Sequence, residues 1–154
     1  MTAIAPSQAT APLVLTIDVG TSSVRALLFD ALARTVEGVA AQEGYSVRST
    51  EDGISEIDPT AMLERVVRCI DAALAQAGPL VDAIGAVALD TLVTSFLAID
   101  AEHQPITPII TYADTRASAQ SEQLRRELDE RVAQERTGCM LRASYWAPRL
   151  AWFR

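Results

Sequence analysis

A succession of three short apolar runs, followed by one long periodic helix, most constrains how this chain can fold. The runs cover residues 13–17, 24–29 and 36–47 and are rich in β-branched side chains, which predicts three strands. A short turn that contains Gly20 joins the first two runs, as in a β-hairpin. We therefore expect the chain to open as an antiparallel meander.

The helix follows a polar loop at residues 49–56. Asp58 is a suitable N-cap, and Pro59 suits the first helical position. Apolar side chains then recur with a period of about 3.6 residues as far as Ala77. Gly78 ends the pattern, because glycine readily takes the conformation that closes a helix.

The second half of the chain again alternates between apolar runs and helical patterns. Its predicted elements are strands at residues 84–89 and 95–99, an extended piece at 106–111, a polar helix at 118–136 and a last helix from 148 to 154. With no repeat and no linker, residues 13–154 are expected to belong to one domain. Residues 1–12 are rich in Ala, Thr, Pro and Ser and predict a disordered tail. The order of elements predicts an α/β fold with a mixed sheet.

The composition excludes several classes of site. All 13 basic residues are Arg, so no Lys is present for a P-loop or a Schiff base. His103 is the only His, which argues against a zinc site with several His ligands. The net charge of −7 argues against a nucleic-acid partner, and no apolar stretch is long enough to suggest a membrane. Cys139 and Cys69, the latter on the apolar side of the first helix, indicate free thiols and a cytoplasmic location.

The turn of the first hairpin carries the sharpest chemical signal. It reads Asp18, Val19, Gly20, Thr21, Ser22, Ser23, Val24, Arg25. The glycine lets the backbone approach a ligand closely, while the three hydroxyl groups and the turn amides offer donors to phosphate oxygens. Asp18 would repel a phosphate unless Mg²⁺ lay between them, and Arg25 adds positive charge. An ordinary hairpin turn is the alternative interpretation of the same residues.

This turn, followed by Leu28-Phe29-Asp30, resembles the phosphate-binding hairpin of the sugar kinase, Hsp70 and actin superfamily. Three later segments resemble one branch of it, the FGGY carbohydrate kinases. Residues 56–59 resemble the family's Glu-x-Asp-Pro segment. Residues 111–116 resemble its Trp-x-Asp-x-Arg segment, with Tyr112 replacing Trp. Residues 137–152 resemble its Thr-Gly…Tyr…Lys-Leu-x-Trp segment, with Arg149 replacing Lys.

The resemblance implies a fold and a reaction. The chain would be the N-terminal part of a ribonuclease-H-like (actin-like ATPase) domain. The full-length family transfers the γ-phosphoryl group of ATP, with Mg²⁺, to a small sugar, polyol or sugar acid. The metal would be held with the help of Asp18, and the phosphates would contact Gly20, Thr21, Ser22, Ser23 and Arg25. The family's catalytic Asp would lie beyond Arg154, so we assign no catalytic residue here and expect the chain to be inactive alone.

The resemblance also assigns an acceptor side. Positions 92–94, where many relatives have Gln-Met-His, read Leu, Val and Thr here, which leaves Val93 and Thr94 as substrate residues. Tyr145 matches an aromatic that lines the cleft in some relatives, with simple packing against Trp146 as an equal alternative. A non-catalytic truncated or split-gene domain is the second hypothesis for the chain. Its partner would be a second copy or the missing part of the polypeptide.

Two further carboxylates need an interpretation. Asp114 is expected to be a structural salt bridge or helix cap beside Arg116 rather than a base. Asp90 ends a predicted strand and suits a pocket or a turn equally. His103 is expected in a surface turn.

Overall fold

The computed structural model describes residues 2–154, which separate into two compact units. One unit contains the chain up to Ser46 together with Thr60–Leu92; the other contains Val47–Pro59 and Val93–Arg154. The chain passes between the two units three times, after Ser46, Pro59 and Leu92. No single linker segment separates the two units, so the sequence shows no boundary between them and suggests only one domain.

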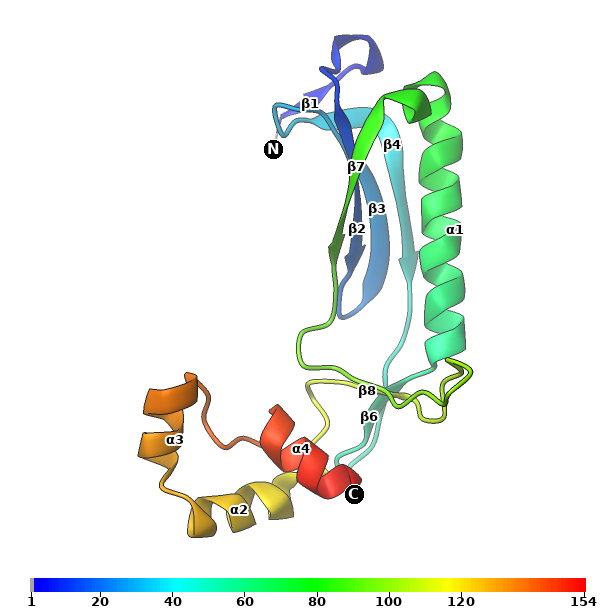
Figure 1. The fold of residues 1–154 in the computed structure, drawn as a ribbon. Helices are drawn as coiled ribbons and strands as arrows, with labels where there is room; N and C mark the ends of the chain where they lie inside the picture. The colour runs from blue at the N-terminus through cyan, green and yellow to red at the C-terminus, as the bar shows by residue number, and fades with distance from the viewer. Residues whose placement is uncertain (1) are drawn as a thin grey trace. The chain divides into compact units, whose positions relative to one another are not determined.

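The first unit is built on a five-stranded sheet in the order β1-β4-β3-β2-β7 (Figure 1). Its strands are β1 (Ala3–Ile4), β2 (Leu13–Val19), β3 (Ser23–Phe29), β4 (Thr35–Gly44) and β7 (Ile84–Asp90). Strands β2, β3 and β4 are antiparallel neighbours, so the predicted meander is confirmed. Strand β7 is parallel to β2, and β1 is parallel to β4, which makes the sheet mixed.

The core of this unit lies between one face of the sheet and helix α1 (Pro59–Ala77). Alternate residues of β2 and β3 are buried on that face, as the pairs Leu15↔Leu28 and Ile17↔Ala26 illustrate. Cys69 of α1 is buried, and its thiol donates to the carbonyl of Val24 at 3.5 Å. The predicted helix and the core position of its cysteine are both confirmed. A short 3-10 turn, η2 (Gly78–Ala83), leads from α1 to β7.

The structure gives secondary structure to the segment that the sequence assigns to a disordered tail. Strand β1 pairs with Thr35 and Val36 of β4, and the side chain of Ile4 is buried. A 3-10 turn, η1 (Pro6–Gln8), follows. The edge of β4 offers backbone partners to β1, and one apolar side chain gives the segment a place in the core.

The second unit contains a small sheet and three helices. Its strands are β5 (Arg48–Ser49), β6 (Ser55–Ile57) and β8 (Ile109–Ile110), in the order β5-β6-β8. Its helices are α2 (Ser118–Glu127), α3 (Glu130–Thr137) and α4 (Trp146–Phe153). The expected loop at residues 49–56 therefore carries parts of a hairpin.

Two predictions for this unit are wrong. Residues 95–99 form isolated bridges, from Phe96 to Ile110 and from Ile99 to Pro105, rather than a strand. The helix predicted at 118–136 is broken after Glu127. Asp129 caps the second helix there, because its carboxylate accepts the Val132 amide at 3.1 Å. Among the described residues, no helix combines the length and apolar character that a membrane crossing requires.

Candidate functional site

The hairpin between β2 and β3 brings its two charged residues together. Asp18 and Arg25 are partners across the antiparallel ladder, and Nη2 of Arg25 lies 3.3 Å from Oδ2 of Asp18. Both side chains are partly exposed. The guanidinium thus neutralises the carboxylate at the place where the sequence suggests that phosphates bind.

Gly20 keeps the space beside this ion pair open. Its amide donates to the carbonyl of Ser23 at 3.0 Å and closes the turn. A Cβ at this position would lie 3.7 Å from Oδ1 of Asp18 and 3.9 Å from Nη2 of Arg25. The absence of a side chain therefore leaves polar atoms of both residues accessible, which suits a ligand that needs positive and negative groups in one place.

The three hydroxyl residues of the turn have different environments. Thr21 and Ser22 are exposed, as a phosphate-binding role requires. Ser23 is buried, and its hydroxyl accepts a hydrogen bond from Nε2 of Gln42 at 3.1 Å. Because Ser23 is buried, the two exposed hydroxyl groups are the more available donors.

Tyr45 is a residue of this site that the sequence analysis missed. Its hydroxyl donates to the carbonyl of Gly20, and its amide donates to the carbonyl of Ser22 at 3.0 Å. Burial raises the pKa of Tyr45, and the nearby charge of Asp18 raises it further. Tyr45 comes just after β4, in a segment that we expected to be only strand. No sequence pattern near it predicts its hydrogen bonds to the turn.

A second carboxylate lies at the same edge of the sheet. Asp90 is the register partner of Asp18 at the carboxyl ends of parallel strands β7 and β2. Its Oδ1 accepts the amide of the next residue, Thr91, at 2.9 Å, so one of its two oxygens is engaged locally. No three His, Cys, Asp or Glu side chains converge on one point among residues 2–154. Carboxylate oxygens suit Mg²⁺, which keeps several waters, so the donor set of Asp18 and Asp90 fits this ion without a protein cage.

The second unit contains the residues expected to face the acceptor. Val93 is 77% exposed. Thr94 has a positive φ of 59°, which is strained for a β-branched residue. Its Oγ1 is buried and has no hydrogen-bond partner among the described residues. A strained residue with an unused hydroxyl is typical of a functional position.

Tyr145 immediately precedes α4 and is partly buried. Its amide donates to the carbonyl of Arg142 at 2.9 Å. The neighbouring Trp146 packs against Phe96, with ring centroids 5.6 Å apart. Packing at this point therefore involves Trp146, and the substrate role of Tyr145 stays a prediction.

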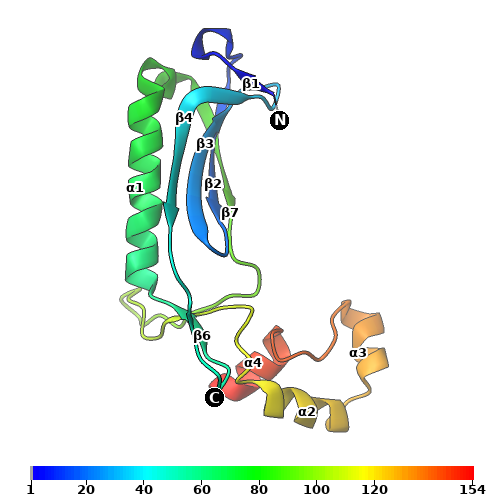
Figure 2. The same cartoon turned by 180° about the vertical axis from the view of Figure 1, so that it is seen from behind.

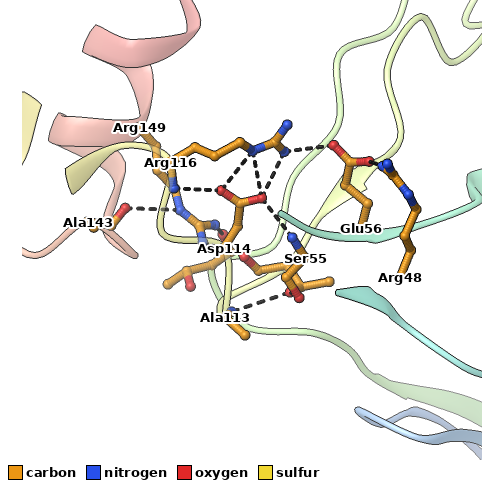
Figure 3. A network of polar contacts seen from close by, with 10 residues as sticks. Arg48, Ser55, Glu56, Ala113, Asp114, Arg116, Ala143 and Arg149 are labelled. Carbon is orange, nitrogen blue, oxygen red and sulfur yellow. Dashed lines mark hydrogen bonds and ion pairs between the residues drawn. The ribbon is translucent and has the colours of Figure 1, made fainter. Parts of the chain in front are cut away.

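Asp114 lies at the centre of a polar network in the second unit (Figure 3). It is 3% exposed, and it accepts hydrogen bonds from Nε of Arg116 at 2.9 Å and from the amide of Ser55 at 3.0 Å. Arg116 also lies 2.7 Å from Glu56, which in turn pairs with Arg48 at 2.9 Å. Burial alone would raise the pKa of Asp114, but the hydrogen bonds from Arg116 and Ser55 outweigh it and lower the pKa. A carboxylate held in this way is a weak base, in keeping with the expected structural role.

The sequence matches a family model over most of its length. The N-terminal domain model of the FGGY family of carbohydrate kinases matches residues 13–154. The chain belongs to the FGGY family. The resemblance seen in its motifs is thus confirmed.

Individual relatives agree with this assignment. A gluconokinase from Bacillus subtilis is 27% identical over 138 residues, which cover 90% of this chain and 26% of that protein. A glycerol kinase from Allorhizobium ampelinum is 31% identical over 140 residues, with 90% and 28% covered. The crystal structure of xylulose kinase from Rhodospirillum rubrum matches with a TM-score of 0.84 at 21% identity, over 92% of this chain and 28% of that one. This FGGY chain therefore has the fold of the sugar kinases, as expected, and spans about a quarter of the length of the curated relatives it matches.

Proposed function

We propose that this chain supplies the phosphate hairpin and part of the acceptor site of a carbohydrate kinase. The whole protein would transfer the γ-phosphoryl group of ATP to a hydroxyl of a small sugar, polyol or sugar acid. The observation that carries the proposal is the arrangement of Asp18, Gly20 and Arg25 on one hairpin, in a chain of the FGGY family. Residues 13–154 would be the N-terminal part of the first domain of that kinase, in the cytoplasm.

Each hairpin residue has a distinct role in this proposal. Asp18 would hold Mg²⁺, whose charge offsets the phosphates when ATP is bound. The exposed hydroxyls of Thr21 and Ser22 would donate to phosphate oxygens, and Arg25 would add a positive charge. Ser23 would contribute through its backbone, because its side chain is buried. Tyr45 would keep the turn in shape through the carbonyl of Gly20.

The acceptor alcohol would contact Val93, Thr94 and Tyr145. Thr94 brings the buried Oγ1 that has no partner among the described residues, and a sugar hydroxyl is a group that such an atom can bond. The exposed Val93 would contact carbon-bound hydrogens of the acceptor. We assign no residue of this chain as the base that takes the hydroxyl proton, because Arg116 holds Asp114 and one oxygen of Asp90 already accepts the Thr91 amide.

Two measurements on the purified chain test the proposal. Calorimetric titration with tripolyphosphate should detect binding that Mg²⁺ strengthens, and Asp18→Asn should abolish the effect of Mg²⁺. An assay with ATP, Mg²⁺ and a panel of pentoses, polyols and aldonic acids should show no sugar-dependent release of ADP. Absence of any tripolyphosphate binding would contradict the assignment of the hairpin. Clear sugar-dependent release of ADP would show that the chain is active alone.

A second function, association with another polypeptide, is favoured by one observation on β7. In the parallel pairing with β2, Val87 and Leu89 are partners of the buried Leu15 and Ile17, so they lie on the core face of the sheet. They are nevertheless 62% and 66% exposed. Strand β7 is an edge strand of the sheet. In both views α1 runs beside β4, and β3 and β2 lie between β4 and β7 in the strand order (Figures 1 and 2). An uncovered core face on an edge strand favours association.

Sedimentation experiments show whether the chain associates with itself or stays monomeric. The wild-type chain should self-associate with rising concentration, and Val87→Glu should shift it toward the monomer. Ile106→Glu changes a similarly exposed apolar residue of the second unit and serves as the matched control. A wild-type chain that stays monomeric at all concentrations argues against self-association.

A further inference from the structure

Arg149 is a charged residue in the interior of the second unit. Only 1% of it is exposed, although it stands in the first turn of α4. Arg116, by comparison, pairs with the carboxylates of Asp114 and Glu56. Arg149 instead donates to backbone carbonyl groups. Burial lowers the pKa of Arg149, and this effect outweighs the charge of Asp114, which raises that pKa.

Three carbonyl groups surround the guanidinium. Nη1 donates to the carbonyl of Thr94 at 2.7 Å, Nη2 to the carbonyl of Thr111, and Nε to the carbonyl of Ala143 at 3.3 Å, the last of which Figure 3 shows. The plane of Arg149 also lies over the ring of Phe96, with 5.7 Å from Cζ to the centroid. Arginine suits this position because its rigid fork presents donors in several directions at once.

Two of the three segments that Arg149 joins carry the candidate acceptor residues. The carbonyl of Thr94 belongs to the residue with the positive φ and the unpartnered Oγ1. The carbonyl of Ala143 lies in the turn that leads into Tyr145, whose own backbone closes that turn on Arg142. Thus one buried side chain connects two places that are far apart in the sequence and that the proposed function assigns to the same substrate.

We propose that Arg149 is a positioning residue for the acceptor side of the site. It holds the carbonyl of Thr94, and with it the left-handed backbone that sets the direction of Oγ1. Through Ala143 it also sets the start of α4 beside Tyr145. The inference rests on the proposed function, since it takes Thr94 and Tyr145 as the acceptor residues.

The experiment compares Arg149→Met with Arg149→Lys, and uses Arg126→Met on the exposed side of α2 as the matched control. Hydrogen exchange followed by mass spectrometry reports on each segment separately. In Arg149→Met, amides in residues 92–96 and 141–145 should exchange at least about tenfold faster, while those of α1 stay unchanged. Arg149→Lys keeps a charge and three donors, so it should restore part of the protection. Unchanged exchange at 92–96 in Arg149→Met overturns the proposal. If Arg149→Met unfolds the second unit, Arg149→Lys decides: faster exchange confined to the two segments supports the proposal, and wild-type exchange overturns it.

A binding measurement separates this inference from the proposed function. Kd values are measured for the panel of pentoses, polyols and aldonic acids, and for tripolyphosphate with Mg²⁺. Arg149→Met should weaken acceptor binding about tenfold and leave tripolyphosphate binding unchanged, with Arg149→Lys in between. If the wild-type chain binds an acceptor and Arg149→Met binds it equally well, the inference fails and the proposed function stands. If no acceptor binds to the wild-type chain, the proposed acceptor site fails, and the exchange data alone decide whether Arg149 positions these segments.

Discussion

Arg25 and Asp18 face each other across the β2–β3 ladder, with Nη2 of Arg25 at 3.3 Å from Oδ2 of Asp18. A phosphate would compete with Asp18 for Arg25, and a cation would compete with Arg25 for Asp18. The two residues should therefore affect ligand binding in opposite directions, which a purely structural ion pair would not do.

The first prediction exploits this opposition. Arg25→Gln should weaken tripolyphosphate binding by about three- to tenfold, because a charge-assisted hydrogen bond is lost, and should strengthen Mg²⁺ binding. Asp18→Asn should strengthen tripolyphosphate binding without Mg²⁺, because a repulsive charge is removed, and should abolish the gain from Mg²⁺. Calorimetry with and without Mg²⁺ measures both effects, with Arg126→Gln as control. Equal changes of the same sign in the two variants would show that the pair only supports the hairpin.

The second prediction concerns the polar network around Asp114. Asp114→Asn removes the charge that Arg116 and the Ser55 amide bond, so it should lower the free energy of unfolding by about 1.5–3 kcal/mol. Asp71→Asn, on the exposed side of α1, should change it by less than about 0.5 kcal/mol. Urea unfolding at neutral pH measures both. A loss at Asp114 no larger than that at Asp71 would contradict the structural role.

The pH dependence of the same variant follows from the sign of the shift. The folded-state pKa of Asp114 lies below its ordinary value of 3.8, so the ionised carboxylate stabilises the folded state above that pH. This contribution is lost as the pH falls through the lower, folded-state pKa. The difference between wild type and Asp114→Asn should thus be largest above about pH 5 and shrink below pH 3.8. A difference that grows on acidification would mean that the sign is wrong.

The sequence predicted the first unit far better than the second. The period of two in β2 and β3 and the period of α1 are strong because one face of each element is buried, and the glycine after Ala77 marks the end of the helix. In the second unit, Phe96 and Ile110 form only an isolated bridge, so an apolar run there was mistaken for a strand. The break between α2 and α3 depends on Asp129 acting as a cap in the middle of a charged pattern that continues through it.

The sequence predicts site residues that lie close together along the chain, but not those that act on a distant segment. Residues adjacent in sequence, such as Asp18 and Gly20, were found because one turn carries them all. Tyr45 and Arg149 act on carbonyl groups that lie far away along the chain, and a backbone carbonyl leaves no signature in a sequence. Arg149 was visible only as a substitution for Lys in a motif, without any indication of what it holds.

The third prediction uses two glycines with positive φ as a matched pair. Gly53 has φ 91°, and a Cβ there would collide with Oγ1 of Thr115; Gly38 has φ 76° and open space. Gly53→Ala should therefore destabilise its unit by at least about 2 kcal/mol, and Gly38→Ala by about 1 kcal/mol from the backbone conformation alone. Thermal unfolding measures the two losses. Equal losses would mean that Thr115 moves aside without cost.

The fourth prediction concerns the two free thiols. Cys69 is buried and burial raises its pKa, whereas Cys139 is exposed. N-ethylmaleimide at neutral pH should label Cys139 within minutes and leave Cys69 unlabelled until the chain is unfolded. Intact-mass spectrometry counts the adducts, and Cys139→Ser should abolish the fast one. Rapid labelling of both thiols in the native chain would contradict the packing of α1 against β3.

The fifth prediction separates stability from function at Thr94. Thr94→Gly removes the cost of a positive φ, so the second unit should become more stable by up to about 1 kcal/mol despite the added freedom of glycine in the unfolded chain. The same change removes Oγ1, and acceptor binding should weaken by about tenfold. Thr94→Ser keeps the hydroxyl and the strained backbone, so it should bind the acceptor nearly as the wild type does. Unfolding curves and acceptor titrations of the three proteins give both readouts. If Thr94→Gly is destabilised and still binds acceptor normally, Thr94 is a packing residue and its strained backbone has another cause.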